Sequence, residues 1–347
     1  MTRYLLVANP TARSGGAAER IRQILDRVLA RGIEADFFPT KAKGQTIPEL
    51  ARLLQDMRYD ACIYMGGDGT FREVAAGIMA SQTQTPMGMM PSGTANDQGL
   101  SFGVSNADSA LERNLDIISA GHTLALDAGR AQRFDDAGKQ TGEILFFDSI
   151  GWGLQSDILV VRNQDKEAVE DIPVIRRLYR DKAVYVGAAV DRFLATYIEP
   201  AKFTADVEAW VGQEHIQQHW PGLADVVIKN TAIYGGSWVL HRWSEPNDGL
   251  FEFVPIQGRR EWLSKAVRDL AALPIWQEDL DLLGVSHSQG FSAQRFRLTL
   301  SRPEGQPSVT CQIDGEQWQS GNLFEVEVIA NAVPLLVPAD FKPPWKG

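Results

Sequence analysis

The first 120 residues alternate between strand-like and helix-like hydrophobic patterns. A continuous apolar run at residues 4–8 is typical of a buried strand, and apolar residues three and four apart then predict a helix ending near Arg31 and Gly32. The same two signals predict further strands at residues 34–38, 61–65 and 87–90 and helices at 47–57 and 107–120. Strands that alternate with helices predict a doubly wound α/β domain with a mainly parallel sheet.

Strand patterns dominate the chain from residue 123 onward. Turn residues separate these strands, which predicts a β-rich domain of antiparallel strands arranged as a sandwich. Helical patterns at residues 173–197 and 260–273 interrupt the series. The expected strands cover residues 124–130, 144–150, 203–210, 226–230, 250–255, 296–300, 309–313 and 324–329.

The change of pattern divides the chain into parts. We expect an α/β domain at residues 1–125 and a β-rich domain with helical insertions at residues 126–320. Residues 321–347 are expected to form a C-terminal strand and tail that return to the first domain.

Charge and composition exclude several classes of partner. The net charge of −10, from 34 basic and 44 acidic residues, disfavours non-specific binding to nucleic acid and gives no general attraction to anionic membranes. No apolar run reaches the roughly 20 residues that span a bilayer, and the N-terminus does not resemble a secretion signal. The sequence thus predicts a cytoplasmic protein without a transmembrane segment, and it leaves the oligomeric state open, a homodimer included.

Two polar loops follow predicted strands of the α/β domain. The first, G-G-D-G-T at residues 66–70, lacks both the P-loop lysine and a complete G-x-G-x-x-G pattern. Its three glycines still allow close approach of a ligand to the backbone, and Thr70 offers a hydroxyl to a phosphate at a helix N-terminus. The second loop, P-S-G-T-A-N-D, follows the next strand, so both loops are expected at the carboxyl edge of the sheet, where open α/β folds bind ligands.

Two other candidate groups favour a structural role. His215 and His219 are four residues apart, but no third ligand is spaced for zinc, so an exposed surface pair is the preferred interpretation. Cys62 and Cys311 each lie inside an apolar run and form no C-x-x-C pair, which predicts buried thiols.

The polar motifs, taken in order, resemble the diacylglycerol kinase catalytic family, which includes bacterial lipid kinases and the sphingosine and ceramide kinases. They are Asn9-Pro10, Thr40, G-G-D-G-T, P-S-G-T-A-N-D and the distant I-D-G-E at residues 313–316. The resemblance implies a nucleotide-binding first domain and a lipid-binding β-rich domain. It implies ATP and Mg²⁺ as cofactors and transient contact with a membrane surface that presents the lipid. The nucleotide-binding residues that it implies are Asn9, Thr40, Gly66, Gly67, Asp68, Gly69, Thr70, Phe71, Arg72, Ser92, Gly93 and Thr94.

The same resemblance implies the remaining roles. Glu316 matches the carboxylate usually proposed as general base, and Asp68 matches a carboxylate that serves Mg²⁺-ATP or the acceptor hydroxyl, so the choice of base stays open. Asp248, with the carbonyls of Glu245 and Leu250, matches a structural Mg²⁺ site. The lipid-side candidates are Asn96, Asp97 and Asp157, the last by similarity to sphingosine and ceramide kinases.

Departures from the family keep the acceptor open. Phe146-Phe147-Asp148 stands where many members have an F-x-N strand, and Tyr234-Gly235-Gly236-Ser237 is one glycine short. Diacylglycerol is the first choice of acceptor, and a sphingoid base or ceramide is the second. NAD kinase, which shares G-G-D-G-T, and a nucleotide-binding regulator without catalysis remain as alternatives.

Overall fold

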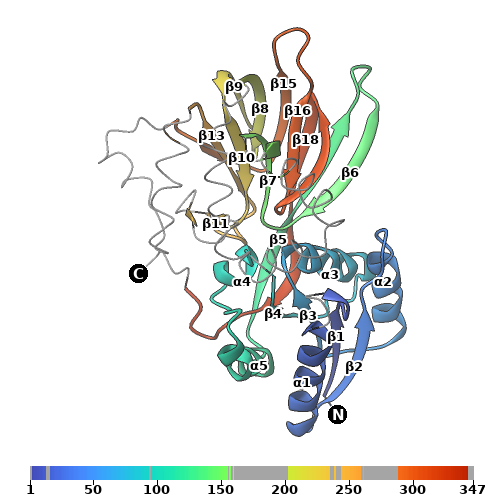
Figure 1. The fold of residues 1–347 in the computed structure, drawn as a ribbon. Coiled ribbons are helices and arrows are strands. Elements are labelled where there is room, and N and C mark those ends of the chain that lie inside the picture. The colour runs from blue at the N-terminus through green and yellow to red at the C-terminus, as the bar shows by residue number, and fades with distance from the viewer. Residues whose placement is uncertain are drawn as a thin grey trace, which may run out of the picture. The chain divides into compact units, whose positions relative to one another are not determined.

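The computed structural model describes residues 2–12, 16–93, 95–154, 156–157, 159, 202–234, 238–239, 244–258, 261 and 288–342 (Figure 1). The chain forms two compact units. Unit 1 contains residues 1–128, 246–249 and 329–347, and unit 2 contains residues 129–245 and 250–328. The predicted helices at 173–197 and 260–273 and the turn at 235–237 lie outside the described residues.

Unit 1 is built on a parallel sheet in the order β2-β1-β3-β4 (Figure 1). The C-terminal part of β18 joins this sheet, since Leu335 pairs in parallel with Met87 of β4. Three of the strands, β1, β3 and β4, are almost entirely buried, as expected for a parallel sheet that is covered on both faces. The strand bounds are β1 Arg3–Ala8, β2 Glu34–Pro39, β3 Ala61–Gly66, β4 Met87–Pro91 and β18 Leu323–Leu336.

Helices cover both faces of the unit 1 sheet. Apolar residues of α1 and α5 share one core cluster with Leu6 and Ile63 of the sheet. Neighbouring strand residues point the opposite way, and there Tyr64 meets Phe71 of α3 edge to face at 5.3 Å, while α2 packs on α3. The doubly wound fold is therefore confirmed. The helices are α1 Gly16–Ala30, α2 Thr46–Asp56, α3 Asp68–Ser81, α4 Asp97–Ser101, the 3₁₀ turn η2 Asp108–Ala110 and α5 Leu111–Ala120.

Unit 2 is an antiparallel sandwich, which confirms the predicted β-rich domain. One layer has the order β18-β15-β8-β9, and the other has the order β14-β13-β10-β7-β16-β17. Alternate residues of β8 and β15 share one core with Trp152 and residues of β10, β13 and β16. The bounds are β8 Phe203–Val211, β9 Glu214–Leu223, β10 Asp225–Lys229, β13 Phe251–Ile256, β14 Phe291–Ala293, β15 Arg295–Ser301, β16 Val309–Ile313 and β17 Glu316–Gly321.

One predicted strand is wrong. Residues 144–150 form two strands, β6 (Gln140–Phe146) and β7 (Ser149–Gly153), with a break at Phe147 and Asp148. The break arises because the backbone amides there bind a side-chain carboxylate, described below, instead of a neighbouring strand. The remaining strands are β5 (Thr123–Phe134), which pairs with β6, and the short pair β11 (Ile233–Tyr234) and β12 (Trp238–Val239).

Candidate functional site

The strand ends of unit 1 bring the predicted nucleotide-binding loops to one edge of the sheet. The Thr40 amide donates to the Ala8 carbonyl at 3.0 Å, which joins the ends of β2 and β1. The Ser92 amide donates to the Gly66 carbonyl at 2.7 Å, which joins the ends of β4 and β3. Asn9 follows β1 directly, and its Oδ1 accepts from the Thr11 amide at 3.0 Å. Carboxyl edges of parallel sheets are the usual ligand sites of open α/β folds.

The two glycine loops touch each other through their backbones. A Cβ added to Gly93 would lie 2.5 Å from the Cα of Gly67, so a side chain at this point would force the loops apart. A Cβ on Gly66 would lie 2.4 Å from the Oγ1 of Thr70. The glycines are therefore required by close approach, and they form a polar cradle beside the N-terminus of α3, where helix amides favour an anion.

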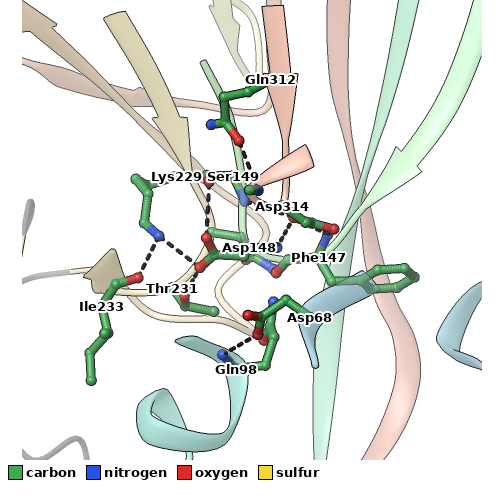
Figure 2. Close-up of polar contacts among 12 residues, drawn as sticks. Asp68, Gln98, Phe147, Asp148, Ser149, Lys229, Thr231, Ile233, Gln312 and Asp314 are labelled. Carbon is green, nitrogen blue, oxygen red and sulfur yellow. Dashed lines mark hydrogen bonds and ion pairs between the residues drawn. The ribbon is translucent and has the colours of Figure 1, made fainter. Parts of the chain in front are cut away.

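Asp68 lies in the first turn of α3 and bridges to α4. Its Oδ1 accepts from the Gln98 amide at 3.2 Å, so the carboxylate caps the helix that follows the second loop (Figure 2). Phe71 is fully buried and packs on Tyr64, so only its backbone can line the loop. Thr94 lies outside the described residues.

Asn96 closes the second loop. Its Oδ1 accepts from the Gly93 amide and its Nδ2 donates to the Gly93 carbonyl, both at 2.7 Å. The residue is 2% exposed and left-handed, with φ of 56°. This side chain holds the loop, and the substrate contact expected of it stays a prediction. Asp97, the first residue of α4, is partly exposed.

In unit 2, the I-D-G-E motif forms the tight hairpin between β16 and β17. Ile313 pairs with Glu316, and the two residues between them have φ of 47° and 75°. Positive φ at both central positions is the type I′ geometry, for which Asp-Gly is a preferred sequence. Glu316 is the first residue of β17 and is exposed at the end of this hairpin.

Asp314 binds the break between β6 and β7 (Figure 2). Its Oδ1 accepts from the amides of Asp148 at 2.9 Å and Ser149 at 3.1 Å, and its Oδ2 accepts from the Phe147 amide at 3.2 Å. Successive amides that converge on one point form an anion-binding concavity. Here the chain's own carboxylate, 5% exposed, occupies it.

A buried ion pair lies next to this concavity. The Lys229 ammonium donates to Asp148 Oδ1 and to the Ile233 carbonyl, each at 2.7 Å, and the lysine side chain is fully buried (Figure 2). The Thr231 hydroxyl also donates to Asp148 Oδ1, and the Ser149 hydroxyl donates to Asp148 Oδ2 at 2.9 Å. The partners of Asp148 come from β7, β10 and the segment after β10.

Asp127 fastens two distant segments of unit 1. Its Oδ2 accepts from the Gly249 amide at 2.8 Å, and its Oδ1 accepts from the Asn331 amide at 2.7 Å. Its own amide donates to the Pro246 carbonyl at 2.7 Å. Burial raises the pKa of this carboxyl above its ordinary value, and the two amide bonds oppose the shift.

The predicted Mg²⁺ ligand Asp248 lies in the turn at residues 246–249, which Asp127 holds. Asp248 is exposed, and the next residue, Gly249, is left-handed with φ of 76°. One carboxylate and two carbonyls are oxygen donors of the kind that Mg²⁺ prefers, so the residues fit the ion. Across the described residues, no group of three or more His, Cys, Asp or Glu is placed to hold a metal, and the predicted set, with one carboxylate and two carbonyls, is not a group of that kind.

The two histidines of β9 each contact a separate carboxylate on β8. His219 Nδ1 lies 2.6 Å from Asp206, and His215 Nε2 lies 3.2 Å from Glu208. All four side chains are at least 39% exposed. The histidines are therefore the exposed surface pair that the sequence favoured.

Asp157 has two neighbours in unit 2. The Thr310 hydroxyl donates to its Oδ1 at 2.6 Å, and an Nη2 of Arg302 lies 3.7 Å from its Oδ2. The Arg302 side chain is 6% exposed, whereas that of Asp157 is 25% exposed. The Asp157 carboxylate, which was expected to contact the lipid head group, therefore contacts the Thr310 hydroxyl and lies near the Arg302 guanidinium.

Comparison with known proteins finds relatives of the N-terminal part of the chain. Residues 3–131 match the family described as the diacylglycerol kinase catalytic domain. The predicted resemblance is confirmed. A diacylglycerol kinase from Staphylococcus saprophyticus is 30% identical over 128 residues, which are 37% of this chain and 41% of the relative. A diacylglycerol kinase from Staphylococcus aureus (strain bovine RF122) is also 30% identical over 128 residues, with 39% of it covered.

The match to diacylglycerol kinases is confined to the N-terminal part. The chain spans about two fifths of the length of the curated relatives it matches. A solved structure of a diacylglycerol kinase from Bacillus anthracis str. Sterne extends the likeness in fold to 98% of both chains, with a TM-score of 0.61 and 15% identity. The diacylglycerol kinase sequence match therefore includes Asn9, Thr40 and both glycine loops, whereas Asp157, Asp248 and Glu316 lie beyond it.

Charged residues outside the predicted site hold the turn at residues 246–249 and the break between β6 and β7. Asp127 and Lys229 were missed, and Asp314 was noted only as part of I-D-G-E. A sequence signal exists for the first two, because each is a charged residue inside or at the end of an apolar strand run, and buried charges are normally paired. The ion-pair partner of Lys229 lies 81 residues away in sequence and the Asn331 amide lies 204 residues from Asp127, so neither pairing could be identified without the structure.

Proposed function

We propose that this chain is an ATP- and Mg²⁺-dependent lipid kinase that transfers the γ-phosphate of ATP to the hydroxyl of diacylglycerol. The observation that carries the proposal is the close approach of Gly67 and Gly93 beside the α3 N-terminus, within the part that matches the diacylglycerol kinase catalytic domain. Two glycine loops that pack this closely beside a helix N-terminus fit a phosphate chain that approaches the backbone. Phosphoryl transfer depends mainly on such positioning and charge stabilisation.

The nucleotide is assigned to the sheet edge of unit 1. Asn9, Thr40, Thr70, Arg72 and Ser92 supply side-chain polar groups there. The backbone of both glycine loops supplies the phosphate cradle. Mg²⁺, when bound with the nucleotide, neutralises phosphate charge.

Glu316 is our choice of general base. Asp68 already accepts a hydrogen bond from the α4 amide at Gln98, which ties its carboxylate to the loop architecture. Glu316 is exposed on a rigid two-residue hairpin, where a carboxylate can accept the proton of an acceptor hydroxyl. We assign Asp68 to support of the nucleotide loops.

The surroundings of Asp157 favour diacylglycerol over a sphingoid base. Diacylglycerol presents a neutral hydroxyl, whereas a sphingoid base presents a protonated amine that needs an anionic partner. The Arg302 guanidinium, 3.7 Å from the Asp157 carboxylate, offsets that charge and opposes a second cation. The acceptor reaches the protein from a membrane surface, and the net charge of −10 requires this contact to be local. No helix in the described ranges has the length and apolarity to cross a bilayer.

A lipid panel tests the proposal directly. Full-length protein is incubated with Mg²⁺, labelled ATP and mixed vesicles that contain diacylglycerol, sphingosine or ceramide. We expect label in phosphatidate. Label in sphingosine phosphate or ceramide phosphate would favour the second acceptor class, conversion of added NAD to NADP would favour NAD kinase, and ATP binding without transfer would indicate a regulator.

Two variants with matched controls test the base. We expect Glu316→Gln to lower kcat by about 10²- to 10⁴-fold at unchanged ATP affinity, because a general base contributes that much. Glu304→Gln, in the exposed loop between β15 and β16, controls for loss of a surface carboxylate. Asp68→Asn should instead weaken ATP binding, with exposed Asp26→Asn on α1 as its control. Full turnover by Glu316→Gln would contradict the assignment.

The proposed Mg²⁺ at Asp248 has a readout independent of turnover. If the ion binds the folded state only, millimolar MgCl₂ should raise the melting temperature of the wild-type chain and not that of Asp248→Ala. An equal shift in both proteins would show that Asp248 does not hold the ion.

A further inference from the structure

We propose that Asp314 is a positioning residue for Glu316: its buried carboxylate clamps the hairpin that carries Glu316 onto the break between β6 and β7. The inference rests on the proposed function, since Glu316 acts as base only if the chain transfers phosphate to a hydroxyl. It adds a residue that does not touch the substrate and whose effect passes through Glu316.

The type I′ turn alone does not account for Asp314. Asparagine and glycine also adopt this geometry well, so turn formation places no demand on a negative charge. The carboxylate is used for another purpose, because it accepts hydrogen bonds from three successive amides at 2.9–3.2 Å. Hydrogen bonds to an ionised acceptor are roughly twice as strong as neutral ones.

Backbone pairing reinforces the clamp from both sides. The Asp314 amide donates to the Ser149 carbonyl at 2.9 Å, and Ile313 pairs with Ile150 of β7. On the other side of the turn, the Gly315 amide donates to Gln312 Oε1 at 2.9 Å. The residues on either side of Asp314, which lie three positions and one position before Glu316, are thus fixed.

The buried ion pair fixes the amides that Asp314 binds. Asp148 supplies one of these amides, and its side chain is held by Lys229 and Thr231. The Asn230 Nδ2 donates to the Phe147 carbonyl at 2.8 Å, and its amide donates to the Asp148 carbonyl at 2.9 Å. A chain of contacts therefore connects the end of β10, through the break, to the hairpin.

Removal of the clamp should loosen the hairpin without removing Glu316. A displacement of about 1 Å at a reacting group can cost on the order of 10²-fold in rate. We therefore expect Asp314→Asn, which keeps the turn preference but not the charge, to lower kcat by that order. ATP binds to residues of unit 1, so its KM should change by no more than about twofold, as for loss of an interaction made only in the transition state.

The test combines kinetics with hydrogen exchange in the full-length protein. Asp314→Asn should speed exchange at the amides of residues 147–149, and its kcat should fall while the KM for ATP holds. Asp135→Asn is the matched control, because Asp135 Oδ1 likewise accepts from two amides, at 2.9 and 3.0 Å, in the exposed turn between β5 and β6. This control should exchange faster only in its own turn and keep full turnover.

A double variant separates positioning from general destabilisation. If Asp314 acts through Glu316, then Asp314→Asn combined with Glu316→Gln should be no slower than Glu316→Gln alone, because residues that act as a unit are non-additive. Multiplied losses would overturn the proposal, as would unchanged turnover in Asp314→Asn. If the wild-type chain is active and either of these two results is found, only the role of Asp314 is refuted. If the wild-type chain is inactive on every lipid, the proposed function itself is refuted.

A second variant covers failure of Asp314→Asn to fold. Gly315→Ala retains the carboxylate but strains the left-handed turn, where open space leaves room for the methyl group. Because the clamp remains, it should leave the amides of residues 147–149 protected and keep kcat within about tenfold of the wild-type value, less than the loss in Asp314→Asn. A loss of kcat as large as about 10²-fold with those amides still protected would overturn the proposal, because the turn and not the clamp would then position Glu316.

Discussion

The two units hold their functional turns by opposite means. In unit 1, the loops at Gly67 and Gly93 meet backbone to backbone, and their contact leaves no room for a side chain at Gly93. In unit 2, the hairpin at Asp314 is held by a carboxylate, and the adjoining break is held by the Asp148–Lys229 ion pair. The glycine contact is therefore disrupted when a side chain is added, whereas the charged contacts are disrupted when one partner is removed.

The difference indicates what each turn is built to accommodate. Backbone amides of glycine loops can bind an anionic ligand, and we expect the loops of unit 1 to do so. In unit 2, a concavity of the same kind is filled by Asp314, so that turn is a fixed support. We therefore expect unit 1 variants to act mainly on ligand affinity and unit 2 variants to act mainly on stability and turnover.

The largest effect should come from breaking the buried ion pair. Asp148→Asn and Lys229→Met should each lower the free energy of unfolding by about 3–5 kcal/mol, because each leaves a buried charge without this partner. The double variant should recover most of that loss. Denaturant unfolding measures all three, and Asp206→Asn, which breaks an exposed pair in the same unit, should cost no more than about 1 kcal/mol. Additive losses in the double variant would contradict the comparison.

The next effect tests the steric contact. Gly93→Ala should lower the free energy of unfolding by about 1–3 kcal/mol, because a Cβ 2.5 Å from Gly67 Cα forces the backbone to shift. ATP affinity, measured by calorimetry, should fall by more than the loss of stability explains. Gly258→Ala is the control, since no atom lies within 4 Å of its added Cβ. Wild-type ATP affinity in Gly93→Ala would remove the basis for the cradle.

A third variant tests whether Asp127, a carboxylate that holds two segments of unit 1, affects stability as the charged residues of unit 2 do. Asp127→Asn should cost about 1–3 kcal/mol at neutral pH, because an asparagine side chain has one acceptor oxygen for the two amides of Gly249 and Asn331. The chemical denaturation midpoint measures this loss. A change confined to ATP affinity would show that the effect of a variant depends on its unit and not on the kind of contact that is lost.

The Asp127 carboxyl also carries a pH signature. Burial raises its pKa in the folded state above the ordinary value of 3.8. The folded state therefore binds this proton more tightly, and the resulting stability, present below the ordinary value, is lost as pH rises through the folded pKa. The stability advantage of the wild-type chain over Asp127→Asn should accordingly shrink as pH rises through that window.

The smallest effect on the free energy of unfolding is expected from loss of an ordinary polar contact, that between Tyr59 and Asp36. The Tyr59 hydroxyl donates to Asp36 Oδ2 at 2.8 Å in unit 1. Burial and this contact raise the pKa of Tyr59 to about 12. Tyr59→Phe should cost about 1 kcal/mol, and thermal unfolding below pH 10 measures it. A loss as large as that of Asp148→Asn would show that burial of charge is not what distinguishes unit 2.

The sequence predicts much of unit 1 because its signals are local. Apolar runs, helical spacing and glycine loops after strands need only neighbouring residues, and they identified the parallel sheet and both loops. The break at Phe147 and Asp148 could not be predicted, because the apolar run through it looks like one strand and Asp314 lies 166 residues from Asp148. Asn96 shows a related limit, since the sequence does not reveal that its side chain closes its own loop through Gly93.

The composition of unit 1 determines when it can fold during synthesis. Its first segment ends at residue 128, yet Val333, Leu335 and Leu336 of β18 are buried in it, and Leu335 pairs with Met87. The ribosome must therefore add more than 200 further residues before the sheet that carries the glycine loops gains its last strand. A nascent chain released early would expose the edge of β4, which makes late truncations more prone to aggregation than their short length suggests.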